Sequence, residues 1–422
     1  MDLFEDLRWR GLAYQWTGED ALPELLNSQK IRLYIGFDPS ADSLTIGNLL
    51  VLILLRRFQA AGHVPIAVVG GATGMVGDPS GRSAERNLLS PEQLEHNKQA
   101  IRSQMERFLD FEGPSPAIMA DNADWLGSLS FIDFLRDVGK HASVNTMLAR
   151  DSVKARLEAE AGISFTEFSY MLMQAYDFVH LNRTYGCVLQ CGASDQFGNI
   201  VAGIDLARRL DGTRLFGLTT PLVTRSDGQK IGKTADGATW LDPEKTSPYR
   251  LYQWFVRVPD EDAGRFLRYY TDLSHEEILD LETQIETAPA KRAAQLRLAE
   301  EVTRLVHGEK ALIRAKEATE VLFGGSLDGL SGSELLDIFA DVPSTQLPKS
   351  RLGDLPLSDA LVETGLVASK SEARRRLDSG GIYLNNQRVE DPGLIVGGEH
   401  LVADGIAVLR SGKRSFALLR FA

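Results

Sequence analysis

The order of apolar and polar positions predicts a strand–helix–strand unit near the start of the chain. Residues 31–37 and 65–69 are short apolar runs of the kind found in buried strands, and residues 44–58 carry apolar side chains at helical spacing. The first part of this helical stretch is apolar on every side, so we expect the helix to be buried. This spacing favours a right-handed βαβ unit, and therefore a parallel sheet within an α/β fold.

Turn and capping residues mark further elements. Ser90 followed by Pro91 gives a helix both a cap and a proline at its first position, and Ser247 followed by Pro248 repeats the signal. The other predicted elements are helices over 131–158 and 166–181, a strand over 187–190, and mostly helix from 248 to about 322.

A linker separates an acidic body from a small tail with a basic face. Residues 323–334 are rich in Gly and Ser, and residues 342–356 hold three prolines. The tail from Arg351 has a net charge of +1, which leaves −13 for the rest of the chain. A capped helix at 370–378 carries three consecutive arginines, and a basic turn spans 410–415. Such a surface suits an RNA backbone, although arginine runs also occur on solvated helix faces.

Composition narrows the class of protein. A length of 422 residues predicts two or three domains, and 43% hydrophobic residues are enough for a sizeable core. The net charge of −12 provides no general field that would attract DNA or a membrane. The longest apolar run, residues 49–55, is too short to span a bilayer, and we expect no signal peptide.

The two cysteines, Cys187 and Cys191, argue against a disulfide scaffold and favour a cytoplasmic protein. Their spacing would fit half of a zinc site. No second pair of ligands accompanies them, so two buried thiols are the favoured interpretation, and we expect no protein-bound metal.

The first strand–helix junction is a candidate phosphate site. The helix begins within the tetrad Thr45-Ile46-Gly47-Asn48, and a helix N-terminus presents unpaired N–H groups and the positive end of its dipole. Gly47 would allow a flat ligand to approach the backbone. The alternative is that this glycine only permits close packing of the helix on the sheet.

Two glycine-containing loops offer further charged groups. The segment GGATGMVGDPSGR (70–82) lacks the glycine order of a dinucleotide fold, but Asp78 suits an ammonium group, and Arg82 and Arg86 suit phosphate. The segment DGQKIGKT (227–234) fails the P-loop spacing by one residue, yet Lys230 and Lys233 could clamp a polyphosphate. Solvated surface loops are the alternative for both segments.

A polar stripe marks the predicted helix at 166–181. Tyr170, Gln174 and Asp177 fall at positions i, i+4 and i+7, so they share one face of the helix. Such a stripe usually faces solvent. A phenol, an amide and a carboxylate in one line could equally bind an amino acid.

In this order, the segments resemble bacterial tyrosyl-tRNA synthetases, which are class I aminoacyl-tRNA synthetases, over essentially the whole chain. The tetrad TIGN (45–48) stands where that family has its HIGH motif, and KIGKT (230–234) stands where it has its KMSKS-type loop. The other blocks that carry the resemblance are GFDPSADSL, GGATGMVGDPSG, FLRDVGKH, GISFTEFSYMLMQAYDF, GASDQFGN and KTSPY.

The resemblance implies an architecture. It predicts a Rossmann-like catalytic domain over 1–225, an α-helical domain that includes the lysine loop over 226–340, and a ribosomal-protein-S-four-type RNA-binding domain over 351–422. It also implies a homodimer that forms through the region around 131–147.

The resemblance also implies roles for individual residues. Those assigned to tyrosine are Tyr34, Asp78, Tyr170, Gln174, Asp177 and Gln196. Those assigned to the ATP nucleotide are Asp38, Gly47, Asn48, Asp195 and Lys233. Those assigned to catalysis around the phosphates are Ser40, Thr45, Arg82, Arg86, Lys230 and Lys233.

The implied reaction has two steps. The tyrosine carboxylate attacks the α-phosphate of ATP, which is a substrate that arrives with Mg2+, and the tyrosyl group then passes to the 3′ end of tRNA(Tyr). None of the seven histidines falls at an assigned position, so we expect catalysis by positioning and charge stabilisation rather than by a general base. Two alternatives stay open: a non-catalytic RNA-binding paralogue and a tryptophan-specific relative.

Overall fold

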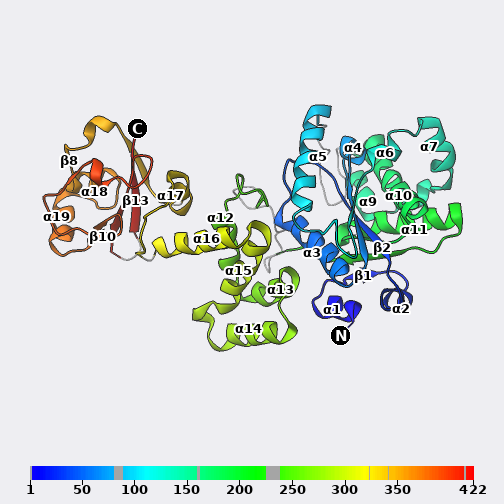
Figure 1. Ribbon diagram of the computed structural model, residues 1–422. Coiled ribbons are helices and arrows are strands. Elements are labelled where there is room, and N and C mark those ends of the chain that lie inside the picture. The colour runs from blue at the N-terminus through cyan, green and yellow to red at the C-terminus, as the bar shows by residue number, and fades with distance from the viewer. Residues whose placement is uncertain are drawn as a thin grey trace. The chain divides into compact units, whose positions relative to one another are not determined.

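The computed structural model describes residues 2–79, 89–158, 162–224, 238–322, 324–340, 342–412 and 415–422. The chain divides into two compact units (Figure 1). The first comprises Met1–Thr246 and Val258–Glu301, and the second comprises Ser247–Arg257 and Val302–Ala422. The domain boundaries implied by the resemblance stay a prediction.

A six-stranded sheet forms the centre of the first unit, with strand order β1-β6-β5-β2-β3-β4. Every neighbouring pair is parallel except the edge pair β1–β6. The predicted parallel sheet and α/β fold class are therefore confirmed. The strands are β1 (Gln15–Trp16), β2 (Arg32–Phe37), β3 (Val64–Val69), β4 (Ile118–Asp121), β5 (Cys187–Ala193) and β6 (Phe216–Thr220).

The predicted strand–helix–strand unit is present as β2, α3 (Ile46–Ala60) and β3. All six residues of β3 are buried, as are nine of the fifteen residues of α3, which explains why both read as apolar runs. The helix begins two residues later than predicted because the preceding residues pair with another segment. The Leu44 carbonyl accepts from the Leu241 amide at 2.8 Å, and Thr45 keeps an extended backbone.

Other helices of the first unit depart from the sequence pattern in detail. The single pattern over 131–158 is divided into α7 (Phe131–Asp137), a 3-10 turn at Gly139–His141, α8 (Val144–Leu148) and α9 (Asp151–Glu158). The break arises because Ala142 and Ser143 take extended backbone conformations. The remaining helices are α1 (Leu3–Trp9), α2 (Ala21–Ser28), α4 (Thr73–Val76), α5 (Pro91–Met105), α6 (Ala123–Leu126), α10 (Phe165–Tyr185), α11 (Phe197–Asp211), α13 (Asp260–Tyr270) and α14 (His275–Thr287).

The second unit combines helices with a five-stranded sheet of order β10-β9-β12-β13-β7. Helix α15 (Ala293–His307) runs from the first unit into the second. The helices within the second unit are α12 (Pro248–Val256), α16 (Glu309–Val321), α17 (Gly332–Ile338), α18 (Leu357–Glu363) and α19 (Lys370–Asp378). Its strands are β7 (Ser344–Leu347), β8 (Leu355–Pro356), β9 (Ile382–Leu384), β10 (Gln387–Arg388), β11 (Ile395–Val396), β12 (Ile406–Ser411) and β13 (Ser415–Phe421).

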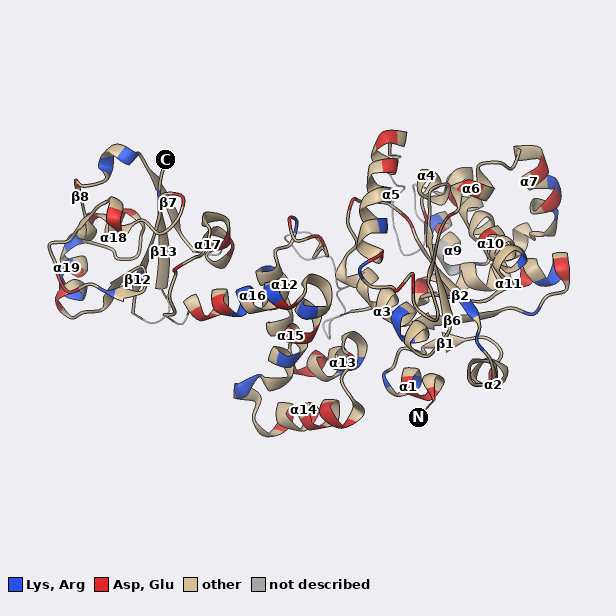
Figure 2. Cartoon of the chain, in the orientation of Figure 1, with Lys and Arg blue, Asp and Glu red and all other residues tan. Residues whose placement is uncertain are grey.

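The predicted basic features of the tail take two forms. Part of the ribbon of α19 is blue in Figure 2, which marks its Lys and Arg positions, and two of its three arginines, Arg374 and Arg375, are exposed. Arg376 is instead held by Glu372 and by the Ser411 hydroxyl. The predicted basic turn joins β12 to its antiparallel partner β13, and its residues 413–414 lie outside the described part of the chain.

Candidate active site

The candidate residues gather where parallel strands of the first unit end. Asp38 follows β2, the Gly-rich segment follows β3, Asn122 follows β4, and Asp195 follows β5. In an open α/β sheet, ligands bind beyond the carboxyl ends of the strands. The fold therefore brings together polar residues that are up to 157 positions apart in the sequence.

The Thr45–Asn48 turn forms the start of α3. The Asn48 carboxamide oxygen accepts from the Thr45 amide at 3.0 Å and from the Thr45 hydroxyl at 2.9 Å. The Ile46 amide donates to the Thr239 carbonyl at 3.1 Å. Among the described residues, the Gly47 amide has no hydrogen-bond partner, so it is available to an anion. The Thr45 hydroxyl could donate to a phosphate only by exchanging Asn48 for it.

Asp38 and Tyr170 are joined by a hydrogen bond. The Tyr170 hydroxyl donates to one Asp38 oxygen at 2.9 Å, and the Thr73 hydroxyl donates to the other at 2.8 Å. Burial, and next the charge of Asp38, hold the pKa of Tyr170 well above its ordinary value. Tyr170 therefore remains a neutral donor to Asp38.

A chain of amides links Asp78 to α10. The Gln196 carboxamide donates to Asp78 at 2.6 Å, and its oxygen accepts from Gln174 at 3.2 Å. Asn199, which the sequence did not single out, donates to the oxygen of Gln174 at 2.9 Å. The structure thus brings together three of the residues assigned to tyrosine and adds a fourth polar group that fixes their orientation.

Asp177 is a buried carboxylate with two protein donors. The Trp125 indole N–H donates to one oxygen at 2.7 Å, and the Asn122 amide donates to the other at 3.1 Å. Its exposed fraction is 4%, and burial raises its pKa to about 7. Each carboxylate oxygen keeps lone-pair capacity, so the group can accept a hydroxyl proton from a ligand.

Tyr34 offers a second polar group in the same interior. Its side chain is 1% exposed, and its ring makes an edge-to-face contact with Phe178 at a centroid distance of 5.3 Å. The Tyr34 hydroxyl has no hydrogen-bond partner among the described residues. Burial and next the charge of Asp177 raise its pKa. A buried, unsatisfied hydroxyl costs free energy unless a ligand pairs with it.

The other assigned residues are placed as follows. Ser40 is exposed, and its amide donates to the Asp38 carbonyl at 2.8 Å. Asp195 lies half-buried in a 3-10 turn at Ser194–Gln196. Four basic residues lie outside the described part of the chain: Arg82, Arg86, Lys230 and Lys233.

The described part of the chain shows no grouping of side chains for a metal and no membrane-spanning helix. No set of three or more His, Cys, Asp or Glu in that part of the chain is arranged to hold a metal ion. Both cysteines are buried free thiols. No described helix combines the length and the apolar character needed to cross a bilayer.

Comparison with known proteins gives a consistent result over the full length. A family model for class I tRNA synthetases (W and Y) matches residues 26–324, and one for the tyrosine–tRNA ligase SYY-like C-terminal domain matches residues 334–419. The tyrosine–tRNA ligase of Roseiflexus castenholzii is 55% identical over 421 residues, which cover 99% of each chain. That of Geobacillus kaustophilus is 53% identical over 424 residues and 100% of each chain.

A solved structure is similar to the larger part of the chain. The C-terminally truncated mitochondrial tyrosyl-tRNA synthetase of Aspergillus nidulans matches with a TM-score of 0.69 and 30% identity. The match covers 76% of this chain and 94% of the fungal chain.

Proposed function

Because the chain belongs to the class I tRNA synthetases for tryptophan and tyrosine, we infer that it is a tyrosine–tRNA ligase (EC 6.1.1.1). It activates L-tyrosine with ATP to tyrosyl-adenylate and then transfers tyrosine to the 3′ end of tRNA(Tyr). The observation that carries the choice of a phenol-bearing amino acid is the buried Asp177 carboxylate near the unpartnered Tyr34 hydroxyl.

The tyrosine subsite is assigned from the polar side chains at its two ends. At the buried end, Asp177 accepts the hydroxyl proton of the substrate, and Tyr34 donates to the phenol oxygen. At the other end, the carboxylate of Asp78 and the side chains of Tyr170 and Gln174 surround the ammonium group. The amide chain through Gln196 and Asn199 supports this arrangement, because it holds the acceptor oxygens in fixed directions.

The ATP subsite lies at the N-terminus of α3. The helix dipole, Thr45 and Ser40 stabilise the phosphates, and Gly47 lies under the adenosine with Asn48 beside it. Asp38 contacts the nucleotide, and Asp195 contacts its ribose. Arg82, Arg86, Lys230 and Lys233 would supply the positive charge that balances pyrophosphate as it leaves. Mg2+ enters bound to ATP, and it neutralises phosphate charge.

Tyrosine-dependent exchange of pyrophosphate into ATP tests the first step. We expect exchange with tyrosine and at least about 10³-fold weaker exchange, as kcat/KM, with phenylalanine or tryptophan, because a buried polar subsite rejects analogues that leave it unpaired. No exchange at saturating tyrosine would favour the non-catalytic paralogue. Preferential exchange with tryptophan would favour the tryptophan-specific relative.

The second unit is proposed to bind tRNA through residues 351–422. Arg374 and Arg375 are exposed on α19, and exposed arginines next to a basic hairpin suit a phosphate backbone. A cytoplasmic location agrees with two reduced, buried cysteines.

A homodimer through residues 131–147 is also proposed. Large apolar side chains are exposed there: Phe131 at 64%, Ile132 at 69% and Val144 at 58%. A patch of this kind usually marks an interface. We expect sedimentation as a dimer at micromolar concentration, and we expect Ile132→Glu to shift the protein to a monomer, because a dimer would bury the new charge. Sedimentation of the unaltered protein as a monomer would contradict the proposal.

A further inference from the structure

Helix α13 touches the candidate ATP subsite through one buried phenol. Tyr270, the last residue of α13, is 1% exposed, and its ring packs against Phe266 at a centroid distance of 5.9 Å. Its hydroxyl donates to the Ile46 carbonyl at 3.2 Å. Burial raises the pKa of this phenol, so the hydroxyl keeps its proton and remains a donor.

The Ile46 carbonyl matters because it and the Gly47 N–H belong to the same peptide group. A carbonyl in the first turn of a helix already accepts one intrahelical hydrogen bond and has a second lone pair to offer. When a buried hydroxyl occupies that lone pair, the peptide plane is fixed and the group is polarised. The N–H of the same group, on Gly47, then becomes a better donor. This is the amide that lacks a partner among the described residues.

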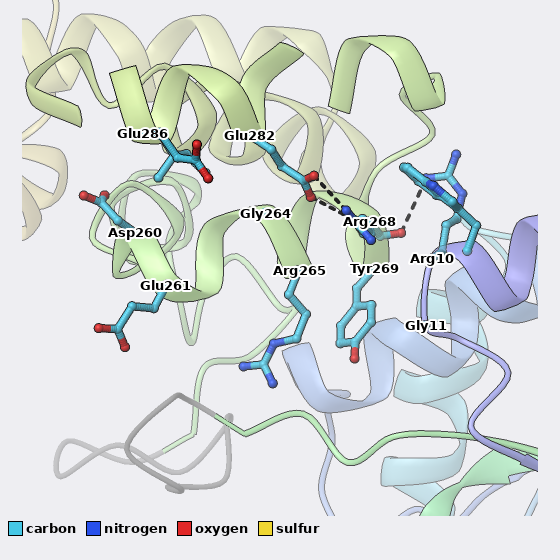
Figure 3. A pocket seen from close by; sticks show the side chains of 12 residues that line it. Arg10, Gly11, Asp260, Glu261, Gly264, Arg265, Arg268, Tyr269, Glu282 and Glu286 are labelled. Atoms are coloured by element: carbon cyan, nitrogen blue, oxygen red, sulfur yellow. Dashed lines mark hydrogen bonds and ion pairs between the residues drawn. The ribbon is translucent and has the colours of Figure 1, made fainter. Parts of the chain in front are cut away.

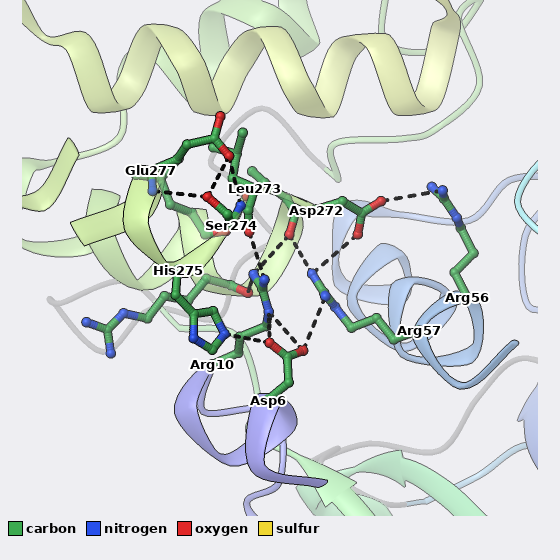
Figure 4. A network of polar contacts seen from close by, with 12 residues as sticks. Asp6, Arg10, Arg56, Arg57, Asp272, Leu273, Ser274, His275 and Glu277 are labelled. Carbon is green, nitrogen blue, oxygen red and sulfur yellow. Dashed lines mark hydrogen bonds and ion pairs between the residues drawn. The ribbon is translucent and has the colours of Figure 1, made fainter. Parts of the chain in front are cut away.

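The residues that follow Tyr270 contact α3 near its C-terminal end. The Thr271 carbonyl accepts from the Arg57 guanidinium, and Asp272 lies 3.4 Å from the guanidinium of Arg57 (Figure 4). Arg57 also lies 3.5 Å from Asp6. The segment 270–272 therefore contacts α3 near both of its ends, which fixes the position of the helix along its axis.

We propose that Tyr270 is a positioning residue for ATP, whose hydroxyl orients and polarises the peptide group between Ile46 and Gly47 where this turn meets the nucleotide. The inference rests on the proposed function. Tyr270 touches no substrate itself. It acts through the backbone of the turn, and it makes the same contact whichever side chains occupy positions 45 and 48.

The adjacent residue provides a matched control. Tyr269 also lies at the end of α13, but it lines a hollow of about 480 Å3 between α1 and α13, together with Arg268, Glu282 and Gly11 (Figure 3). Tyr269→Phe and Tyr270→Phe each remove one phenol oxygen from neighbouring positions and leave the ring in place. Only the second change removes a hydrogen bond to α3.

Pyrophosphate exchange at varied ATP and varied tyrosine distinguishes the two variants. In Tyr270→Phe, we expect kcat/KM for ATP to fall about fivefold, the size of one ordinary hydrogen bond, with tyrosine affinity unchanged within about twofold. Hydrogen exchange measured by mass spectrometry should be faster in a peptide that covers 44–52. Tyr269→Phe should match the unaltered enzyme in each measurement.

Two outcomes would overturn the inference. One is an unchanged kcat/KM for ATP in Tyr270→Phe. The other is an equal loss for ATP and tyrosine together with a lower melting temperature, which would mean that the hydroxyl only stabilises the fold. Absence of exchange in the unaltered enzyme would instead count against the proposed function, so the two failures are distinguishable.

Discussion

Replacing Asp177 by asparagine is expected to lower the preference for tyrosine over phenylalanine, measured as the ratio of kcat/KM values in pyrophosphate exchange, by at least about 100-fold. The carboxylate has two protein donors, Trp125 and Asn122, and both of its oxygens are acceptors. Asparagine keeps the shape but has only one acceptor oxygen. Either a protein donor or the substrate hydroxyl then loses its partner.

The size of this effect follows from where the loss occurs. Asp177 is 4% exposed, so water cannot replace a missing hydrogen bond. A site built to bind a hydroxyl rejects the analogue without it by about 10⁴–10⁵, and tyrosine–tRNA ligases are themselves the standard example. Phenylalanine has no hydroxyl to pair with residue 177. Its kcat/KM should therefore differ far less than that of tyrosine between the unaltered protein and Asp177→Asn.

A matched control lies on the same helix. Arg183 is 46% exposed on α10 and pairs with Asp211 at 2.7 Å, away from the pocket. Arg183→Ala should leave the tyrosine-to-phenylalanine ratio unchanged. A ratio that is also unchanged in Asp177→Asn would show that the phenol does not bind at Asp177.

The same replacement should alter the dependence of stability on pH. The pKa of Asp177 is raised to about 7 in the fold and is close to 3.8 in the unfolded chain. The native state therefore binds the proton more tightly, and the stability that this group contributes below pH 4 is lost as the pH rises towards 7. Relative to the unaltered protein, Asp177→Asn should gain free energy of unfolding between pH 4 and pH 8. A constant difference over that range would contradict this assignment.

Local sequence patterns predicted those candidate residues that lie on helices or strands with a clear apolar pattern. Tyr170, Gln174 and Asp177 were found because a long helix places them on one face. Gly47 was found because an apolar helix follows an apolar strand. In each case, the signal lies within a few turns or one strand of the residue itself.

The partners of these residues left no such local signal. Asn122 follows β4, a strand of four residues that is too short to show a period, and it stands 55 positions before Asp177. Tyr270 lies 224 positions after Ile46, and an aromatic residue on the buried face of an amphipathic helix looks like ordinary core. Only the pairing of distant segments shows which buried polar atoms face the proposed site.

Removing one partner of the buried Arg156–Glu167 pair is expected to lower the free energy of unfolding by about 3–5 kcal/mol. Both side chains are 3% exposed. The guanidinium donates to both carboxylate oxygens, at 3.0 and 2.8 Å, and also to the Gly162 carbonyl at 3.1 Å. Arg156→Met leaves the buried Glu167 carboxylate without its counter-ion. Glu167→Gln likewise leaves the buried Arg156 guanidinium without its counter-ion.

Urea unfolding followed by tryptophan fluorescence measures this loss, because four of the five tryptophans belong to the first unit. The control is again Arg183→Ala, which breaks an exposed pair and should cost less than about 1 kcal/mol. If both pairs cost the same, burial does not decide the value of the ion pair.

The double variant Arg156→Met/Glu167→Leu separates two explanations for the pair. Because two buried charges cost several kcal/mol each to desolvate, an apolar pair of similar volume should restore most of the stability that either single variant loses. Glu167 lies in the first turn of α10, where its amide donates to the Ser164 hydroxyl at 3.2 Å, and the same helix carries the proposed tyrosine subsite. A double variant that regains stability but has a raised KM for tyrosine would show that the ion pair sets the position of α10. A double variant that regains both would show that any well-packed contact at this point positions the helix equally well.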